Sequence, residues 1–540
     1  MPLSRPLRRK AVAFGLVAAL TPVLPRGAVV AAGPPLSAAD VDRIVRQAAA
    51  EAQRIGLKAH IAVTDPEGNV LARFRMAGAP ETSRVRPKPG EEGRRGHGLE
   101  AIDLPATFVA VTKAGTGAFL SSGGNAFSTR TASFIVQDHF PPLVDFTPGG
   151  PLFGVQFSSL PCSDVKSPPL PAGLSADSGG LPLYRDGLLV GGVGVEGDGS
   201  YTLDPDPRDV DTPPEEQAAA AGARGFEAPD LIRSDHILAD GIRLPYANAE
   251  AGAGGSAAAG DYLDGPRGGL ASAFRPATLG DLAGETDPRF PTRAGSALSA
   301  DEVTRILTQA ARQASLTRAA IRQPLGSSAR VSIAVVDVDG RVLGNFRTTD
   351  APVFGFDVAV QKARTANFFS RRGAADDLRR AGLALYLGDG VPLDGSIAFT
   401  SRAVGFLAQP LYPPGIDGTD AGPFSSPRSE WSPFNTGLQL DLVEDAVFAF
   451  LATLRGAGGC SAAVPALANG ITIFPGGVPL YKNGVLVGAI GISGDGVDQD
   501  DLIASAGAAG FDAPAEKRSD QLIIRGVRLP YVKFPRHPDL

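Results

Sequence analysis

The chain has 540 residues, of which 43% are hydrophobic and 20% charged, and its formal net charge is −6. This composition is that of a folded protein with sizeable cores, so it excludes a disordered chain. The mild negative charge gives no electrostatic case for a nucleic-acid-binding protein, which needs clustered Lys and Arg.

The first 32 residues have the order of a secretory signal peptide. Arg8, Arg9 and Lys10 belong to a basic start, an apolar run covers residues 11–20, and small residues complete the segment. The apolar run is too short to span a bilayer, and no later stretch is typical of a membrane span. We therefore expect a signal peptide over residues 1–32 and a mature protein that is periplasmic or secreted, by either the Sec or the twin-arginine route.

The rest of the chain repeats itself once. Residues 179–199 and 476–496 are identical at 13 of 21 positions, and two further pairs of segments recur in the same order. The period is far longer than the roughly 20–50 residues of solenoid repeats. We therefore predict two related lobes, over residues 36–248 and 298–533, joined by a Gly/Pro-rich linker over residues 249–297.

Each lobe is expected to open with an amphipathic helix and a β-hairpin. Ser37 and Ser299 are followed three positions on by an acidic residue, which is the spacing of a capping box. In lobe 1 the hairpin strands are expected at residues 60–65 and 69–75, around the turn Pro66-Glu67-Gly68. A second, small and apolar helix follows in both lobes.

The second half of each lobe is expected to contain a short helix and a second hairpin. The helix that starts at Ser128 or Thr400 should end at a Pro-Pro pair, because proline cannot continue a helix. A strand is expected around residues 152–157. Asp186-Gly187 and Asn483-Gly484 predict type I′ hairpin turns, and a closing helix follows each hairpin. Helices combined with two hairpins favour an α+β fold with an antiparallel sheet.

Two lysines and two histidines are the candidate site residues. Lys113 and Lys362 recur at the same position of the small, apolar helix, where a lysine can contact a carboxylate or act as a base. A lysine that snorkels to solvent is the alternative. Lobe 2 has no histidine before His537. His139 and His97 are therefore the better ligand candidates, because they lie in loop-rich parts of lobe 1.

Other motifs give little support for particular chemistry. Residues 192–197 match a dinucleotide-binding glycine pattern, but they lie on a predicted hairpin strand, where glycines favour close packing of a helix. No His and Cys spacing indicates a structural metal site. Cys162 and Cys460 form a disulfide or remain separate thiols, since an oxidising compartment permits either.

These segments resemble the haem-degrading and haem-binding domain family of GlcG/HbpS-like proteins. The resemblance rests, in lobe 1, on IAVTDPEGNVLARFRMAGAP, TKAGTGAF, GGLPLYRDGLLVGGVGVEGDG and AAAAGARGF, and each has a counterpart in lobe 2. It implies two profilin-like α/β/α lobes, each with a five-stranded antiparallel sheet. It also implies haem as a candidate cofactor, since some members bind haem or iron and assemble into oligomers, but no family motif assigns the haem ligand.

We therefore expect an extracytoplasmic protein that binds a small ligand, haem first, with His139, His97, Lys113 and Lys362 as candidate binding residues. One alternative is an accessory or sensory module without catalysis. Another is an enzyme that acts on small organic molecules through one of the lysines. The lobes should pack as an intramolecular pseudo-dimer, because a duplicated domain tends to keep the self-complementary surface of a homodimer. Further homo-oligomerisation stays open.

Overall fold

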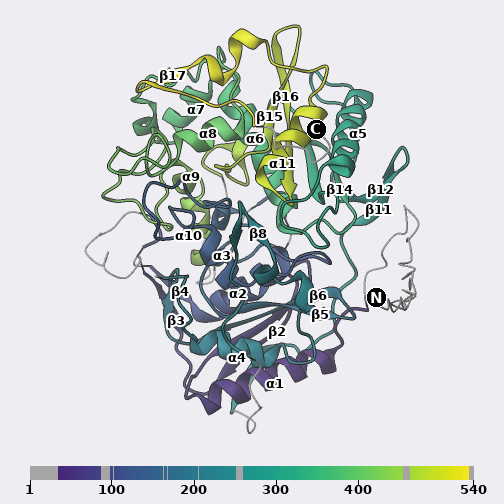
Figure 1. Ribbon diagram of the computed structural model, residues 1–540, viewed down its shortest axis with the longest axis vertical. Coiled ribbons are helices and arrows are strands. Elements are labelled where there is room, and N and C mark those ends of the chain that lie inside the picture. Colours follow the sequence, from purple (N-terminus) through teal and green to yellow (C-terminus); the bar gives the residue numbers. More distant parts are fainter. Residues whose placement is uncertain are drawn as a thin grey trace, which may run out of the picture.

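The computed structural model shows two lobes that follow each other along the longest axis of the molecule (Figure 1). It describes residues 34–86, 98–100, 102–161, 163–166, 168–204, 206–250, 259–453 and 462–533. The first lobe lies at the bottom of Figure 1 and the second at the top. Among the described residues, no helix is both long and apolar enough to cross a membrane.

The sheet of lobe 1 has five antiparallel strands. Their order is β10 (Gly260–Asp264), β2 (Val70–Met76), β1 (His60–Thr64), β6 (Leu188–Glu196) and β5 (Gly180–Arg185). Both predicted hairpins are present. Asp186 and Gly187 have φ of 51° and 78°, as a type I′ turn requires, and Asn483 and Gly484 repeat this with 50° and 76°.

The sheet of lobe 2 has six antiparallel strands, one more than expected. Their order is β11 (Arg275–Leu279), β12 (Leu282–Thr286), β14 (Val342–Thr348), β13 (Val331–Val336), β16 (Val485–Gly494) and β15 (Gly477–Lys482). We expected residues 249–297 to form only a linker. They contain strand β10 of the lobe 1 sheet and strands β11 and β12 of the lobe 2 sheet. This segment therefore supplies edge strands to both sheets.

Helices cover both faces of each sheet, which confirms the α/β/α layering. In lobe 1, α1 (Ala38–Arg54) and α4 (Pro214–Gly222) pack on one face and α2 (Ala106–Phe119) on the other. In lobe 2 the same places are taken by α5 (Ala300–Leu316), α11 (Val497–Gly507) and α6 (Phe354–Ser370). The strand glycines allow this packing, because a Cβ on Gly192 would lie 2.0 Å from the Ala114 carbonyl oxygen of α2.

Two expected elements differ from the structure. Residues Val155–Phe157 form a 3₁₀ turn rather than a strand, and the left-handed Gly154 before it has φ of 90°. Helices α3 (Thr129–Ile135) and α8 (Ser401–Leu407) end well before their Pro-Pro pairs. In lobe 1 the chain turns back onto the helix end, so that the amide of Leu152 donates to the Ile135 carbonyl. Both capping boxes, at Ser37 and at Ser299, are confirmed.

The remaining elements are short and lie in the insertions and tails. They are β3 (Thr82–Val85), β4 (Asp103–Pro105), β7 (Ser200–Tyr201), β8 (Leu238–Ala239), β9 (Ile242–Arg243), α7 (Ala374–Arg380), α9 (Leu438–Asp441), α10 (Glu444–Thr453), β17 (Ile523–Ile524) and β18 (Val527–Arg528).

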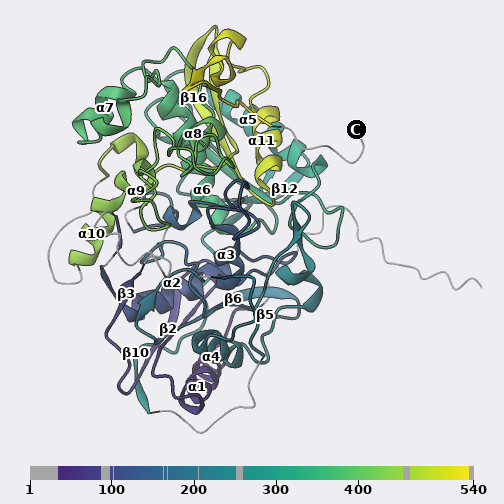
Figure 2. The same ribbon diagram turned by 60° about the vertical axis from the view of Figure 1, so that its left-hand side comes forward.

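The two lobes share their hydrophobic cores. Phe153, Phe157 and Leu160 of lobe 1 are buried within a cluster made mainly by lobe 2. Conversely, a lobe 1 cluster includes five buried side chains of lobe 2: Val353, Phe354, Val358, Phe434 and Phe474. In both views α10 of lobe 2 lies beside β3 of lobe 1 (Figures 1 and 2), and nearby the ring centroids of Phe108 and Phe450 are 6.0 Å apart. The lobes therefore contact each other directly over a broad surface.

Candidate functional site

Lys113 lies in the middle of a buried cluster of carboxylates. Its Nζ is 2.6 Å from Glu215, 2.7 Å from Glu196 and 3.2 Å from Asp177, and the lysine side chain is fully buried. These acids come from α4, from β6 and from the loop before β5, so the fold joins three separate segments here. Lys113 does not snorkel to solvent.

Burial and charge set the protonation of this cluster. Burial alone would lower the pKa of Lys113, but the three carboxylates raise it well above its ordinary value. Burial raises the pKa of Glu196 to about 8, and it also raises those of Asp177 and Glu215, although Lys113 opposes each rise. The ammonium therefore stays charged and is a poor base. The three carboxylate groups have oxygens within 4.8 Å of one another, and Lys113 supplies the positive charge that a metal ion could supply there.

Lys362 has a simpler environment at the equivalent place in lobe 2. Its Nζ is 2.7 Å from Asp500 and 4.9 Å from the ring centroid of Phe474. Phe474 replaces Asp177, and Ser493 replaces Glu196. Burial lowers the pKa of Lys362 and raises that of Asp500 to about 7. The equivalent lysines therefore have different partners, one carboxylate in lobe 2 and three in lobe 1.

His139 lies between the lobes. Its Nε2 is 2.9 Å from Asp417 of lobe 2, and its Nδ1 is 3.6 Å from Asp138. Both ring nitrogens thus face carboxylates. His97 lies outside the described residues, as do both cysteines, residues 1–32 and His537.

Replacing His139 with glutamine should weaken the contact between the lobes in a pH-dependent way. The nearby carboxylate of Asp138, and then that of Asp417, raise the pKa of His139 above 6.5, and partial burial opposes that rise. Its stabilising contribution is therefore present below pH 6.5 and is lost as the pH rises through the raised value. We expect a loss in the free energy of unfolding of less than about 1 kcal/mol at pH 6, because solvent screens the pair, and a smaller loss at pH 9.

Urea unfolding of the full chain at both pH values measures this effect. Asp417→Asn removes the partner in lobe 2 and should reduce the same pH dependence, while Asp138 still raises the pKa of His139. An equal loss at pH 6 and pH 9 for His139→Gln would contradict the assignment.

A cleft of about 890 Å³ lies between the lobes. Its walls are mostly apolar. Aromatic rings and a proline contribute from both sides, namely Phe127, Phe140 and Phe153 of lobe 1 with Phe406, Phe474 and Pro475 of lobe 2. The volume falls within the roughly 300–1,000 Å³ of small-molecule sites. This is a place where a flat, largely apolar molecule can be enclosed.

Two cations of lobe 2 lie in the wall of this cleft. Arg402 of α8 pairs with the buried Asp501 through Nε and with Asp498 through Nη2, both at 2.5 Å. Lys533 Nζ is 2.8 Å from Asp498. The group is electrically neutral, with two cations and two carboxylates, so it has no excess negative charge that would repel a bound anion.

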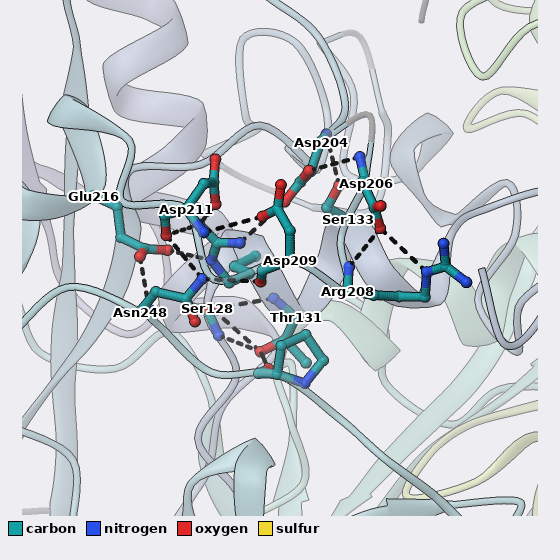
Figure 3. A network of polar contacts seen from close by, with 12 residues as sticks. Ser128, Thr131, Ser133, Asp204, Asp206, Arg208, Asp209, Asp211, Glu216 and Asn248 are labelled. Atoms are coloured by element: carbon teal, nitrogen blue, oxygen red, sulfur yellow. Dashed lines mark hydrogen bonds and ion pairs between the residues drawn. The ribbon is translucent and has the colours of Figure 1, made fainter. Parts of the chain in front are cut away.

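Arg130 holds the equivalent place in lobe 1, but it is fully buried. Three carboxylates surround its guanidinium, Glu216 at 2.9 Å, Asp211 at 2.7 Å and Asp204 at 3.0 Å. Figure 3 labels these three acids. Burial raises the pKa of Asp204 to about 6, and Arg130 opposes that rise. Asp204 and Asp211 belong to an acidic loop, residues 199–213, that lobe 2 lacks.

The sequence interpretation missed this pair of arginines. Each stands two residues after the Ser or Thr cap of the short helix, Ser128 or Thr400. In the sequence, the acidic loop is indicated by the different spacing of equivalent residues in the two lobes. Fifteen residues separate Gly199 from Glu215, whereas three separate their counterparts in lobe 2.

A known family and several solved structures are similar to this chain. The family model described as haem degrading protein HbpS-like matches residues 36–85 and 446–509, which open lobe 1 and close lobe 2. This match confirms the resemblance that the sequence motifs predict. Each matched region has its repeat in the other lobe, as a tandem duplication requires. No curated protein matches the chain.

Three solved structures resemble parts of the chain at low identity. Klebsiella pneumoniae protein ORFY is 16% identical, with 41% of this chain and 94% of that chain covered and a TM-score of 0.21. PduOC, solved as a complex with haem, is 18% identical over 44% and 99%, with a TM-score of 0.20. A double mutant of Streptomyces reticuli HbpS is 22% identical over 38% and 97%, with a TM-score of 0.21.

Proposed function

We propose that the protein binds a small, flat and largely apolar ligand with acidic groups in the cleft between its lobes, and that haem is the first candidate. The observation that carries the proposal is the composition of the cleft, in which aromatic walls adjoin Arg402 and Lys533. A porphyrin has an apolar face for such walls and two carboxylates for such cations. The haem-degrading family to which residues 36–85 and 446–509 are similar supports the same ligand class.

The residues that line the cleft fit the apolar ring and the carboxylates of a porphyrin, but they do not indicate which residue would bind its iron. No histidine lines the cleft in the described part of the chain, and both ring nitrogens of His139 face carboxylates. When bound, haem would supply iron chemistry, while this chain encloses the ring, orients its carboxylates and limits access of water. His139 and His97 stay predictions as iron ligands.

The place of action is a further part of the proposal. We propose that the protein works outside the cytoplasm, because residues 1–32 have the basic, apolar and small-residue order of a signal peptide. Intact mass of protein recovered from its native host tests this. A mass that begins at Met1 would contradict it.

Haemin should titrate the full chain to saturation at one equivalent, with a shifted Soret band. Gln499 lines the cleft at the start of α11, so Gln499→Trp should fill part of the cleft and lower the affinity about tenfold or more. Absorbance titration measures both results. Gln217→Trp places the same bulk on α4, away from the cleft, and should leave the affinity unchanged.

The proposal is wrong if haemin binds without saturation or if both tryptophan variants behave alike. A colourless protein that takes up no haemin would instead favour an accessory or sensory module.

A further inference from the structure

Arg130 and Arg402 are the same residue of the repeated domain. Each lies on the short helix that Ser128 or Thr400 caps, α3 or α8, and each guanidinium makes the same two contacts. The equivalent partners are Glu216 and Asp501 on Nε, and Asp211 and Asp498 on Nη2. The backbone also repeats, since the amides of Asn248 and Lys533 donate to the same carboxylates, Glu216 and Asp501.

The two arginines differ at the third guanidinium nitrogen. Nη1 of Arg130 is 3.0 Å from Asp204, and this arginine is fully buried. No described residue pairs with Nη1 of Arg402, whose side chain is 18% exposed and lines the cleft. One donor of Arg402 therefore faces the open cleft at the position where lobe 1 already holds a carboxylate.

Asp204 occupies the lobe 1 counterpart of the cleft wall. Its carboxylate pairs with Arg130. Its backbone amide donates to Ser133 Oγ at 3.0 Å, and its backbone carbonyl accepts from Gln137 Nε2 at 3.5 Å. Figure 3 shows Ser133 beside Asp204. The counterparts of Ser133 and Gln137 in lobe 2 are Gly405 and Gln409, which both line the cleft. Asp204 thus lies where a ligand of lobe 2 would lie.

The same acidic loop also fills the rest of this site in lobe 1. Tyr201 and Leu203 are buried, and the ring centroid of Tyr201 is 5.7 Å from that of Phe434 of lobe 2. In lobe 2 the three residues Val497 to Gln499 replace the loop and leave the cleft open. The chain therefore has one open site and one site that its own loop fills.

We infer that Nη1 of Arg402 binds a carboxylate of the cleft ligand, in the way that Nη1 of Arg130 binds Asp204. This inference rests on the proposed function and adds the ligand class, a carboxylic acid, and the residue that recognises it. Charge favours the contact more in lobe 2 than in lobe 1. Lobe 2 has Lys533 where lobe 1 has Asn248, so two cations balance the two carboxylates around Arg402. A ligand carboxylate would be the first anion in excess there, whereas Arg130 already has three carboxylates around it.

Two porphyrins that differ only in their carboxylates test the inference on the full chain. Protoporphyrin IX has two free carboxylates, and its dimethyl ester has none. We expect protoporphyrin IX to bind at one equivalent and the dimethyl ester to bind about tenfold or more weakly, measured by quenching of porphyrin fluorescence. This comparison uses the unchanged protein, so it does not depend on the folding of a variant.

Arg402→Gln should then remove the preference for the free acid and leave the affinity for the dimethyl ester nearly unchanged. Arg525→Gln is the matched control, because among the described residues Arg525 pairs with Asp389 and Ala421 on the surface of the same lobe, and it should keep the preference. Equal affinity for both porphyrins, or an undiminished preference in Arg402→Gln, would overturn the inference while leaving the proposed function standing. Failure of both porphyrins to bind would overturn the proposed function and the inference with it.

Discussion

Replacing Lys113 with methionine is expected to lower the free energy of unfolding by about 3–5 kcal/mol at pH 7. The substitution leaves Asp177, Glu196 and Glu215 buried together without the ammonium that lies 2.6–3.2 Å from all three. Their mutual repulsion and their loss of hydration must then be relieved by protonation, which is unfavourable at neutral pH. Urea unfolding of the full chain, followed by tryptophan fluorescence and circular dichroism, measures the loss.

The loss should depend on pH in a defined direction. Carboxylates whose pKa is raised by folding stabilise the protein most below their unfolded pKa, near 4, and this contribution is lost as the pH rises through the folded value. Burial already raises the pKa of Glu196 to about 8 with Lys113 present. Without Lys113 the acids should fold protonated, so the deficit relative to the unchanged protein should shrink toward pH 5.

Lys362→Met provides the matched control at the equivalent site of lobe 2. It leaves a single buried carboxylate, Asp500, whose pKa burial already raises to about 7. One proton neutralises that site, so we expect a loss of about half that of Lys113→Met. Equal losses for the two variants, or a deficit for Lys113→Met that grows toward pH 5, would show that the carboxylates of lobe 1 do not act as one cluster.

Local signals in the sequence were sufficient for most of the fold. Capping boxes at Ser37 and Ser299, and the Asp-Gly and Asn-Gly turns, depend on neighbouring residues only, and the structure has all of them. The edge strands β10, β11 and β12 could not be predicted in this way. Most of their side chains are exposed, and what makes them strands is the backbone pairing that β2 and β14 offer.

The candidate site was predictable only in part. Recurrence in both lobes identified Lys113 and Lys362, but it could not identify their partners. Glu215 follows Lys113 by 102 positions, and only the packing of both α2 and α4 on strand β6 brings the two together. The sequence also favoured lobe 1 for the ligand, because its histidines lie there. The cations of the cleft, Arg402 and Lys533, come instead from lobe 2.

The packing between lobes bears on the expected pseudo-dimer. If the lobes require each other, each lobe should be unstable alone and should fold stably when the other lobe is present. The described contacts place the boundary between lobes near residue 270. The amide of Gly269 donates to the Leu36 carbonyl of lobe 1, whereas Phe274 packs its ring 5.0 Å from Phe356 of lobe 2. A chain divided after Gly269 therefore keeps every strand with its own sheet.

We expect the two fragments, divided after Gly269, to form a soluble 1:1 complex when produced together and to aggregate when produced separately. Phe153, Phe157 and Leu160 would be exposed on the first fragment, and Phe354 and Phe434 on the second. Each such side chain contributes roughly 1.5–3 kcal/mol when it is buried, so the exposed surface strongly favours association. Size-exclusion chromatography with light scattering measures the masses.

A second division site tests whether this boundary is the structural one. Cutting after Glu250 leaves β10 on the second fragment, so the sheet of lobe 1 loses its edge strand beside β2 and Tyr262 leaves its hydrogen bond to Asp42. We expect less complex and a lower unfolding temperature from that pair than from the pair divided after Gly269. If both fragments of the Gly269 pair are soluble monomers that do not bind each other in sedimentation, the lobes are independent domains and the pseudo-dimer proposal is wrong. If they associate, the shared clusters of Phe and Leu act as an interface between lobes, as expected of a duplicated domain that retains the contact of a homodimer.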